Sequence, residues 1–440
     1  MAGAKRVASR IPAVPLRAVA ALFLERQHLD RPRGRRLSAA NLRRFAEDTG
    51  GVQLDTINVV ERAHHLTLWS RFGPYDKRTL DRLVYGRRVL FEYWAHAACL
   101  VPASHFAAWR RVMLEYGTRP RHRAWRAWVR KNRVLVSAVE GAIREKGPLA
   151  NADFEHRRSG KRGGWWDRKP AAHALDWLWK TGRTMVHSRI HFQKRYGVAE
   201  RVMPGAVKAP PLPEHEFPRW HLRQSLRAMG AATGSDLRMY LTFPRIEERR
   251  RVMKEMVDAG EIMEIAVEVR DRSAKPVGPW FILAEDLPAL ARAGRRRSPP
   301  RGTTLLCPFD SMLWHRDRVR RLFGYDYTIE VYTPAPKRRH GYYTLPILHD
   351  GQLIGRLDPK THREARRLEV KSVHFEPWFA KSLPPPAADW GRVDRDAGLA
   401  GVAESLQSLA RFVGAGEVTL GRVSPGALAA PLRRALRAVS

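Results

Sequence analysis

The sequence predicts an α+β protein in which tandem winged-helix (helix-turn-helix) units are followed by a β-rich element. The main observation is a repeat, because helices followed by a two-stranded hairpin are predicted in residues 131–203 and again in residues 219–294. The second observation is the alternation of apolar and polar residues from Tyr327 to Tyr332, which is typical of a half-buried strand. With 440 residues, of which 44% are hydrophobic, the chain is long enough to bury several cores.

The chain carries a large positive charge, with 80 Lys and Arg residues against 44 Asp and Glu residues and a formal net charge of +36. A compact protein with this much uncompensated charge repels itself unless a polyanion lies beside it. The composition therefore favours nucleic acid as the partner, with an anionic membrane surface as the less favoured alternative. Since no apolar stretch of about 18 residues occurs, we expect no segment that spans a bilayer.

Patterns for metal and cofactor binding are sparse. Cys99 and Cys307 are the only cysteines and no CxxC spacing occurs, so we expect neither a disulfide framework nor a cysteine-based zinc site, and the composition suits a reducing cytoplasm. His64 and His65 could be metal ligands, but without Cys or carboxylates at ligand spacing they are expected to pack in a helix or to meet phosphate. The HExxH, GxSxG and Walker motifs are absent. We therefore predict no metal and no cofactor.

The first unit is predicted to run from residue 12 to residue 130. Its helices are expected at Leu16–Gln27 and Ser38–Asp48, with Ser38 as the N-cap of the second helix. The apolar part of the first helix follows a few basic residues, as in a secretory signal, but a proline and an arginine interrupt it, and we interpret it as a core helix. A strand-like run from Val52 to Val60 completes the unit.

The second unit, residues 131–203, begins with a predicted helix at Val134–Lys146. Another helix is expected to start at Pro170, because proline is favoured in a first turn, and to end at Gly182 as its C-cap. The hairpin strands of this unit are predicted at Thr184–Ile190 and Phe192–Val198.

A proline-rich stretch at residues 204–218 is expected to act as a stiff linker. The third unit, residues 219–294, repeats the pattern of the second, and Gly260 takes the C-cap position that Gly182 has there. The predicted helices and strands of the third unit are Arg219–Met229, Ser235–Tyr240, Ile246–Ala259, Ile262–Arg270 and Trp280–Leu283.

The β-rich element is predicted at residues 301–382, as a hairpin with strands at Tyr327–Tyr332 and Tyr342–Leu348 and a basic tip at Pro334–Gly341. A solvated turn is often charged, but adjacent cations repel one another unless they bind an anion, and an aromatic neighbour can press on sugars or bases. The last segment, residues 383–440, is predicted to be a helical tail. The candidate DNA-binding residues of the tip are Lys337, Arg338, Arg339, His340 and Tyr342.

Gln53 and Asp55 are the candidate catalytic pair. They are two residues apart on the strand-like run, so both side chains are expected to project from one face. A carboxylate and an amide presented together can hold one water molecule and stabilise a developing cation. The pattern Gln-x-Asp arises by chance in most long proteins, and such a pair can also simply satisfy backbone groups. The pattern alone does not decide between these roles.

Longer motifs do decide between them. The segment from Val52 to Phe72 reads VQLDTINVVERAHHLTLWSRF, and it resembles the signature of the YcaQ-type crosslink-repair DNA glycosylases. Further similar motifs are LFEYWAHAACLVP, FQKRYGVAERVMP and LCPFDSMLWHRDRVRRLFGYDYTIEVYTPAPKRRHGYY. The quoted motifs lie between Val52 and Tyr343, and the resemblance as a whole is dispersed from about residue 15 to residue 380, so it covers most of the chain.

The resemblance implies a C-shaped arrangement of three winged-helix units and a β-rich element around a basic DNA channel. It also implies monofunctional removal of N7-alkylated purines, including interstrand crosslinks, from double-stranded DNA. The catalytic pair of the family maps onto Gln53 and Asp55, and its groove-probing hairpin onto Pro334–Tyr343. The related azinomycin-resistance glycosylases have Gln at the second catalytic position, so their narrow substrate choice is not implied. Arg71, shortly after the pair, is expected to contact DNA.

This chemistry agrees with the residues. N7-alkylation makes guanine a cationic base that departs neutral, so the enzyme has only to stabilise a cationic sugar and deliver water to C1′. No lysine is required, and an abasic site without strand cleavage is the expected product. Since a base tied to the opposite strand cannot rotate out freely, an open channel suits it better than a tight pocket.

Two classes without catalysis remain as alternatives. A winged-helix transcription regulator explains the charge and the repeats equally well, but it gives no reason for a carboxylate on a DNA-binding unit. A nucleoid-binding protein predicts salt-sensitive binding with no preference for sequence or lesion. Because three linked units can hold DNA together, a monomer is sufficient.

Overall fold

The computed structural model describes residues 13–119, 122–154, 170–268, 278–387 and 390–439. Its strands are β1 (Ala13–Pro15), β2 (Val52–Gln53), β3 (Leu90–Trp94), β4 (Ala98–Pro102), β5 (Leu149–Ala150), β6 (Thr184–Ile190), β7 (Gln193–Val198), β8 (Ala231–Thr233), β9 (Ile262–Glu268), β10 (Trp280–Leu283), β11 (Thr303–Leu305), β12 (Leu345–His349), β13 (Gln352–His362), β14 (Arg367–Phe375) and β15 (Glu417–Ser424). Its helices are α1 (Leu16–Arg26), α2 (Ala39–Thr49), α3 (Ala63–Phe72), α4 (Lys77–Asp81), α5 (Phe106–Tyr116), α6 (Arg123–Lys131), α7 (Arg133–Lys146), α8 (Pro170–Lys180), α9 (Ala199–Val202), α10 (Pro204–Lys208), α11 (Phe217–Met229), α12 (Gly234–Met239), α13 (Arg249–Asp258), α14 (Leu287–Arg295), α15 (Arg316–Phe323), α16 (Pro377–Ala380), α17 (Arg395–Val413) and α18 (Ala429–Ala438).

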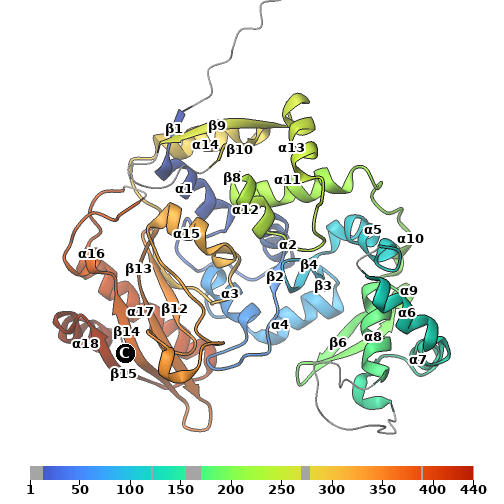
Figure 1. The fold of residues 1–440 in the computed structure, drawn as a ribbon. Helices are drawn as coiled ribbons and strands as arrows, with labels where there is room; N and C mark the ends of the chain where they lie inside the picture. The colour runs from blue at the N-terminus through green and yellow to red at the C-terminus, as the bar shows by residue number, and fades with distance from the viewer. Residues whose placement is uncertain (1–12, 120–121, 155–169, 269–277, 388–389, 440) are drawn as a thin grey trace, which may run out of the picture.

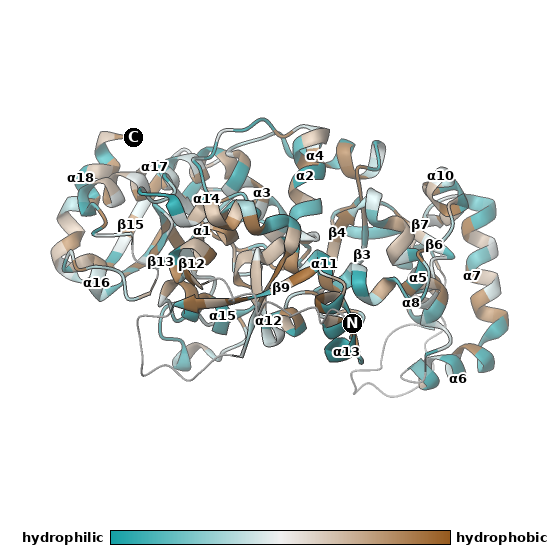
Figure 2. Ribbon diagram, turned by 90° about the horizontal axis from the view of Figure 1, so that it is seen from above, coloured by the Kyte–Doolittle hydropathy of each residue, from teal (hydrophilic) through white to brown (hydrophobic). Residues whose placement is uncertain are grey.

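Within these ranges the strands form four sheets, with the orders β2-β4-β3, β5-β7-β6, β1-β9-β10-β8 and β11-β12-β13-β14-β15. The largest sheet lies on one side of the molecule and the β5–β7 sheet on the opposite side, with β2 and α3 between them (Figure 1). Hydrophobic and hydrophilic bands alternate along the outer helix α7 (Figure 2), in which Val136, Val139 and Ile143 are the buried residues. Across the residues that the structure describes, no helix combines the length and the apolar character needed to cross a membrane.

The predicted first helix is confirmed as α1, and it lies in the interior. Leu16 and every residue from Ala18 to Leu24 are buried. The helix packs against α11, α14 and α15, which come from much later in the chain, and β1 pairs in parallel with β9. The N-terminal segment therefore connects elements that come from distant parts of the sequence.

The strand predicted from Val52 to Val60 is wrong beyond its second residue. Strand β2 ends at Gln53, and the last ladder bond is donated by the Leu54 N–H to the Ala98 carbonyl at 2.8 Å. The chain then turns, because the Asp55 carboxylate accepts a hydrogen bond from the backbone N–H of Ile57 at 2.8 Å. A short acidic side chain that binds the backbone two residues ahead favours a turn over a strand.

The hairpin and the caps predicted for the second unit are confirmed. Gly182 follows α8 with φ of 71°, and a Cβ there would lie 2.7 Å from the sulfur of Met113. Strands β6 and β7 pair antiparallel, and the turn between them places His191 and Phe192 at φ of 47° and 67°. The tip of this hairpin points toward the centre of the molecule (Figure 1).

The helices and strands predicted within residues 219–294 are also present, although the helix expected from Ile246 begins at Arg249. Residues 269–270 of the predicted strand lie outside the described residues, and β9 ends at Glu268. The proline-rich stretch is more than a spacer, because it contains α10 and the N–H of Leu212 donates to the Ala107 carbonyl at 2.9 Å.

A buried ionic cluster joins this unit to α15. Asp236 in α12 is fully buried, and its carboxylate accepts hydrogen bonds from His315 Nδ1 at 2.7 Å and from Arg318 at 3.1 Å. Arg321 donates to both carboxylate oxygens, at 2.7 and 2.8 Å. The backbone N–H of Thr233 donates to the same group at 2.9 Å. The cluster fixes α15 against the start of α12.

Two predictions for the C-terminal third are wrong. Residues Tyr327–Tyr332 form no strand. Tyr327 is buried, and its hydroxyl donates a hydrogen bond to the Thr344 carbonyl at 3.0 Å. The returning strand is β12, which pairs with β11 and β13. The tail is not wholly helical, because β15 lies between α17 and α18 and pairs in parallel with β14.

Candidate active site

Gln53 and Asp55 lie where β2 ends, between the two outer sheets. Gln53 pairs with Cys99 of β4, and its side chain is half-buried. Among the residues that the structure describes, its amide has no hydrogen-bond partner. Asp55 is also half-buried and lies on the turn that follows, so that the two side chains belong to a strand end and a loop rather than to one strand face. Because Asp55 is a candidate catalytic residue, we call residues 54–62 the catalytic loop.

The carboxylate of Asp55 has no ion-pair partner within 4 Å in the described part of the chain. Partial burial raises the pKa of Asp55 above its ordinary value of 3.8. The backbone N–H groups of Ile57 and Thr56 and the positive charge of Arg62 act in the opposite direction. The outcome is a carboxylate that is partly desolvated, fixed in orientation and free to interact with a cation.

One hairpin holds the catalytic loop from the side of the largest sheet. At the end of β13, the N–H of Thr361 donates to the Val59 carbonyl at 3.0 Å. Next to it, Arg363 donates to Asn58 Oδ1 at 2.8 Å and to the Val60 carbonyl at 3.2 Å. The loop that carries Asp55 is therefore anchored to the turn between β13 and β14.

A second hairpin holds the same loop from the opposite side. Arg62 donates to the Thr56 carbonyl at 3.1 Å, and its guanidinium lies 3.8 Å from the centre of the Phe192 ring at the β6–β7 tip. Arg189 lies 4.2 Å from the same ring and donates to the Phe192 carbonyl at 2.6 Å. Buried Glu92 accepts two hydrogen bonds from Arg189, at 2.6 and 2.7 Å, which fixes this arginine. The catalytic loop therefore contacts two hairpins, β13–β14 on one side and β6–β7 on the other.

Three arginines, Arg62, Arg189 and Arg363, lie close to one another at the catalytic loop. Burial is the first cause that lowers the pKa of Arg62, and repulsion from Arg189 and Arg363 adds to it. These guanidinium groups are therefore near one another and near Asp55, whose charge acts on Arg62 in the opposite sense. Such a cluster favours an anion such as phosphate next to the carboxylate.

The predicted DNA-binding tip follows a tyrosine that lies near Asp55. Tyr332 is 76% exposed, and after burial the charge of Asp55 is the main cause that raises its pKa. Tyr342 is the next group whose charge raises the pKa of Tyr332. This aromatic residue of the predicted tip therefore lies in the same region as Tyr332.

The tip itself is a folded loop rather than the end of a hairpin. Glu330 accepts hydrogen bonds from the backbone N–H groups of Arg339, His340 and Gly341, at 2.7, 2.8 and 3.0 Å. Gly341 has φ of 142°, and a Cβ there would lie 2.3 Å from the Asp358 carboxyl carbon. The loop can therefore present side chains without a ladder of strand hydrogen bonds.

The side chains of this loop differ in their exposure. Lys337 and Arg339 are exposed, whereas Arg338 and His340 are half-buried. Arg338 donates to the Thr333 carbonyl at 2.9 Å, and its guanidinium lies 4.7 Å from the Tyr342 ring centre. The two exposed cations are the ones most available to an external anion.

The position of Arg71 corrects the expectation that it contacts DNA. Its side chain is 2% exposed and forms a bidentate ion pair with Asp310, whose side chain is 0% exposed. Arg71 also donates to the Gln27 carbonyl at 3.0 Å and to Ser70 Oγ at 2.7 Å. A guanidinium enclosed in this way has no surface left for a phosphate, so Arg71 joins α3 to the segment before α15.

The adjacent histidines are buried in α3. His65 Nδ1 is 2.9 Å from the Tyr75 hydroxyl, and the His64 ring stacks on Phe192 with 5.8 Å between centres. Burial is the main cause that lowers the pKa of both rings, to about 4 for His65. The described residues contain no group of three His, Cys, Asp or Glu side chains that could hold a metal ion.

Sequence reasoning missed four residues of this region. Tyr332 and Phe192 lie in segments whose resemblance to the glycosylase family was noted, yet nothing in those segments indicates that they approach Asp55. Arg62 is only seven residues from Asp55, and its role follows from a contact across the loop. Arg363 has no sequence signal, because it acts on a loop that is 305 residues away.

Comparisons with known proteins give the family of the chain. A family model described as DNA glycosylase AlkZ-like matches residues 46–412, a range that includes Gln53, Asp55 and both anchoring hairpins. The solved structure of Streptomyces sahachiroi DNA glycosylase AlkZ matches with a TM-score of 0.60 at 20% identity, over 93% of this chain and 100% of that one. The structural likeness shows a shared fold, and the family match speaks against a regulator without catalysis. The chain therefore belongs to the AlkZ-like DNA glycosylase family, which makes it a DNA-repair enzyme that hydrolyses N-glycosyl bonds.

Proposed function

We propose that this glycosylase removes N7-alkylated purines from duplex DNA, including guanines held in interstrand crosslinks, and leaves an abasic site in base excision repair. The observation that carries the proposal is the state of Asp55 in a chain with a net charge of +36. It is a half-buried carboxylate two residues after Gln53, and among the described residues it has no ion-pair partner and the Gln53 amide has no hydrogen-bond partner. A cationic lesion is attracted to such a group, whereas a neutral base gains less from it.

In the proposed reaction the C1′–N9 bond breaks and its electron pair moves to the alkylated base, which departs neutral. The ionised Asp55 stabilises the cationic sugar that remains, and it accepts a proton as water adds to C1′. Gln53 orients that water through its amide. The half-buried positions of both side chains allow contact with substrate while limiting the screening by bulk solvent.

The architecture of the complex is part of the proposal. We take residues 12–130, 131–203 and 219–294 as winged-helix units that form a C-shaped body with the β-rich element around a basic channel, as a monomer in the cytoplasm. Because a crosslinked base cannot rotate out freely, we further propose that attack occurs while the base is still close to the duplex. A DNA complex with a fully enclosed, flipped purine would rule out this last point.

The direct test is base release from defined duplexes. One duplex carries a single N7-methylguanine, a second carries a nitrogen-mustard crosslink, and a third is unmodified. Alkali treatment after incubation converts abasic sites into strand breaks, and omission of alkali shows whether the enzyme itself cuts the strand. We expect alkali-dependent breaks at the lesions alone. If neither alkylated duplex releases a base, the proposed substrate class is wrong.

The rate of base release should fall on the acid side of the pH profile. Only ionised Asp55 can accept a proton, so the rate should drop about tenfold per pH unit once the pH is below its pKa. Because burial raises that pKa above 3.8, the fall should begin at a higher pH than for an exposed aspartate. Single-turnover rates between pH 4 and 8, corrected for spontaneous depurination, test this. A rate independent of pH across that range would contradict a role as base.

The loop at residues 334–341 should contribute to DNA affinity. Changing Arg338 and Arg339 to Ala should weaken binding and lower the slope of log affinity against log salt by about 0.9 for each lost phosphate contact. Fluorescence anisotropy with labelled duplex measures both quantities. Arg434→Ala with Arg437→Ala, on exposed positions of α18, removes the same charge elsewhere. If both double variants behave alike, the loop is merely solvated.

A further inference from the structure

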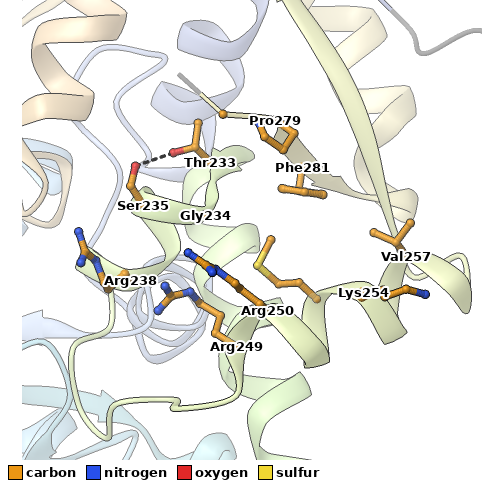
Figure 3. Close-up of a pocket in the computed structure, with 12 residues that line it drawn as sticks. Thr233, Gly234, Ser235, Arg238, Arg249, Arg250, Lys254, Val257, Pro279 and Phe281 are labelled. Carbon is orange, nitrogen blue, oxygen red and sulfur yellow. Dashed lines mark hydrogen bonds between the residues drawn. The ribbon is translucent and has the colours of Figure 1, made fainter. Parts of the chain in front are cut away.

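A pocket of about 600 Å³ lies between α12, α13 and β10, outside the region of Asp55. Its walls are of two kinds. Arg238, Arg249 and Arg250 lie along one side, and Met253 and Phe281 contribute apolar surface to the rest (Figure 3). None of these residues takes part in the proposed hydrolysis.

The three arginines of this pocket lie near a fourth, Arg245, which does not line it. Arg238, Arg245, Arg249 and Arg250 form no ion pair within 4 Å in the part of the chain that the structure describes. Partial burial is the main cause that lowers the pKa of Arg249, and repulsion from the other three arginines lowers it further. An anion that enters between these adjacent cations would lower their mutual repulsion.

The neighbouring residues of the same helix provide a contrast. Arg251 forms ion pairs with Glu248 and with Glu255, the second at 2.5 Å. Lys254 is paired with Asp258 at 2.5 Å. Helix α13 therefore carries both neutralised and unpaired charges. Lys254 also lines the pocket, but the two α13 cations that line it without an ion pair in the described part of the chain are Arg249 and Arg250.

Hydrogen bonds connect the segment after α12, next to the pocket, to the sheet that contains β2. The residues after α12 contact the β3–β4 turn, since the Phe243 N–H donates to the Ala95 carbonyl at 3.0 Å and Thr242 Oγ1 to the His96 carbonyl at 2.7 Å. His96 Nδ1 is also 2.7 Å from the Tyr240 carbonyl. Because β4 pairs with β2, a ligand in the pocket is held at a fixed position relative to Gln53.

We infer that this pocket binds the sugar–phosphate backbone of DNA, on a duplex arm that flanks the lesion. Phosphates meet the unpaired guanidinium groups, and the carbon-rich deoxyribose lies against Met253 and Phe281. The inference rests on the proposed action on duplex DNA. A free nucleotide carries the same chemistry, and the test separates the two sources.

The test uses the full chain and lesion-free duplex, so that its outcome does not depend on base release. Arg249→Ala and Arg250→Ala are made singly and together, and anisotropy is measured between 50 and 300 mM NaCl. The matched controls are Arg251→Ala, which is ion-paired and is not among the residues that line the pocket, and Arg434→Ala with Arg437→Ala. Each pocket change should lower the salt slope by about 0.9, and the double variant should bind about tenfold more weakly.

The results decide between the sources of phosphate. If the pocket variants match their controls in slope and affinity, the inference is overturned. If 1 mM dTMP raises the melting temperature of the wild type but not of the double variant, while both bind duplex equally, the ligand is a free nucleotide and the DNA assignment is overturned. Circular dichroism and thermal melting establish that the variants, which change exposed or half-buried side chains, remain folded.

Discussion

Asn in place of Asp55 should lower the single-turnover rate of base release from N7-methylguanine duplex by about 10²- to 10⁴-fold, the range lost when a positioned general base is removed. Asn is nearly isosteric and its side-chain oxygen can still accept the N–H of Ile57, which preserves the turn. It cannot carry the charge that stabilises a cationic sugar, and it cannot accept a proton from water. DNA affinity should stay close to that of the wild type or rise slightly, because a negative charge is removed.

A neighbouring carboxylate provides the control for this effect. Glu61 lies in the same loop but is paired with Lys77, and Glu61→Gln removes one negative charge without changing Asp55. We expect this variant to keep most of its activity. If both variants lose activity equally, only the net charge of the loop matters. Base release by Asp55→Asn at the wild-type rate would remove the residue from the mechanism.

The second large effect is on stability. Asp236→Asn should lower the free energy of unfolding by about 3–5 kcal/mol, as is typical when one partner of a buried ionic cluster is removed. The change leaves Arg318, which is 1% exposed, and the neighbouring Arg321 without a negative partner. Urea denaturation followed by circular dichroism measures the difference. Asp258→Asn removes an exposed ion pair with Lys254 and should cost less than about 1 kcal/mol.

The same cluster makes stability depend on pH. Burial alone would raise the pKa of Asp236, but Arg318, His315 and Arg321 outweigh it and hold the pKa far below 3.8. Since the folded-state pKa is lowered, this contribution is present above pH 3.8 and is lost as the pH falls toward the folded-state value. The wild type should therefore lose more stability than Asp236→Asn on acidification below pH 4. An equal loss in both would contradict the assignment.

Local rules recovered much of the fold from the sequence. The cap at Ser38 and the helix end at Gly182 depend on residues within one or two turns, and both are present. The strand predicted at Tyr327–Tyr332 is absent although the alternation is present, because its inward residues pack against the cores without a partner strand. Strand β15 was missed because its partner, β14, can be recognised only in three dimensions.

The candidate site was predictable to a similar extent. Gln53 and Asp55 could be named because a long motif surrounds them, but the turn that begins at Asp55 depends on a hydrogen bond that no periodicity records. Arg71 was misassigned, since basic residues near a catalytic motif suggest DNA contact and its partner Asp310 is 239 residues away. Phe192 and Arg363 act on the catalytic loop from other sheets, which no local pattern can indicate.

The attachment of the catalytic loop to two hairpins sets the minimal length of an active chain. A truncated form that ends before residue 361 would keep Gln53 and Asp55, yet it would lose the hydrogen bonds that Thr361 and Arg363 make to that loop. Transplanting the first 130 residues onto another scaffold would lose the contact with Phe192 as well. The candidate catalytic pair is encoded locally, but its geometry is a property of the assembled chain, so fragments and chimeras should preserve both hairpins.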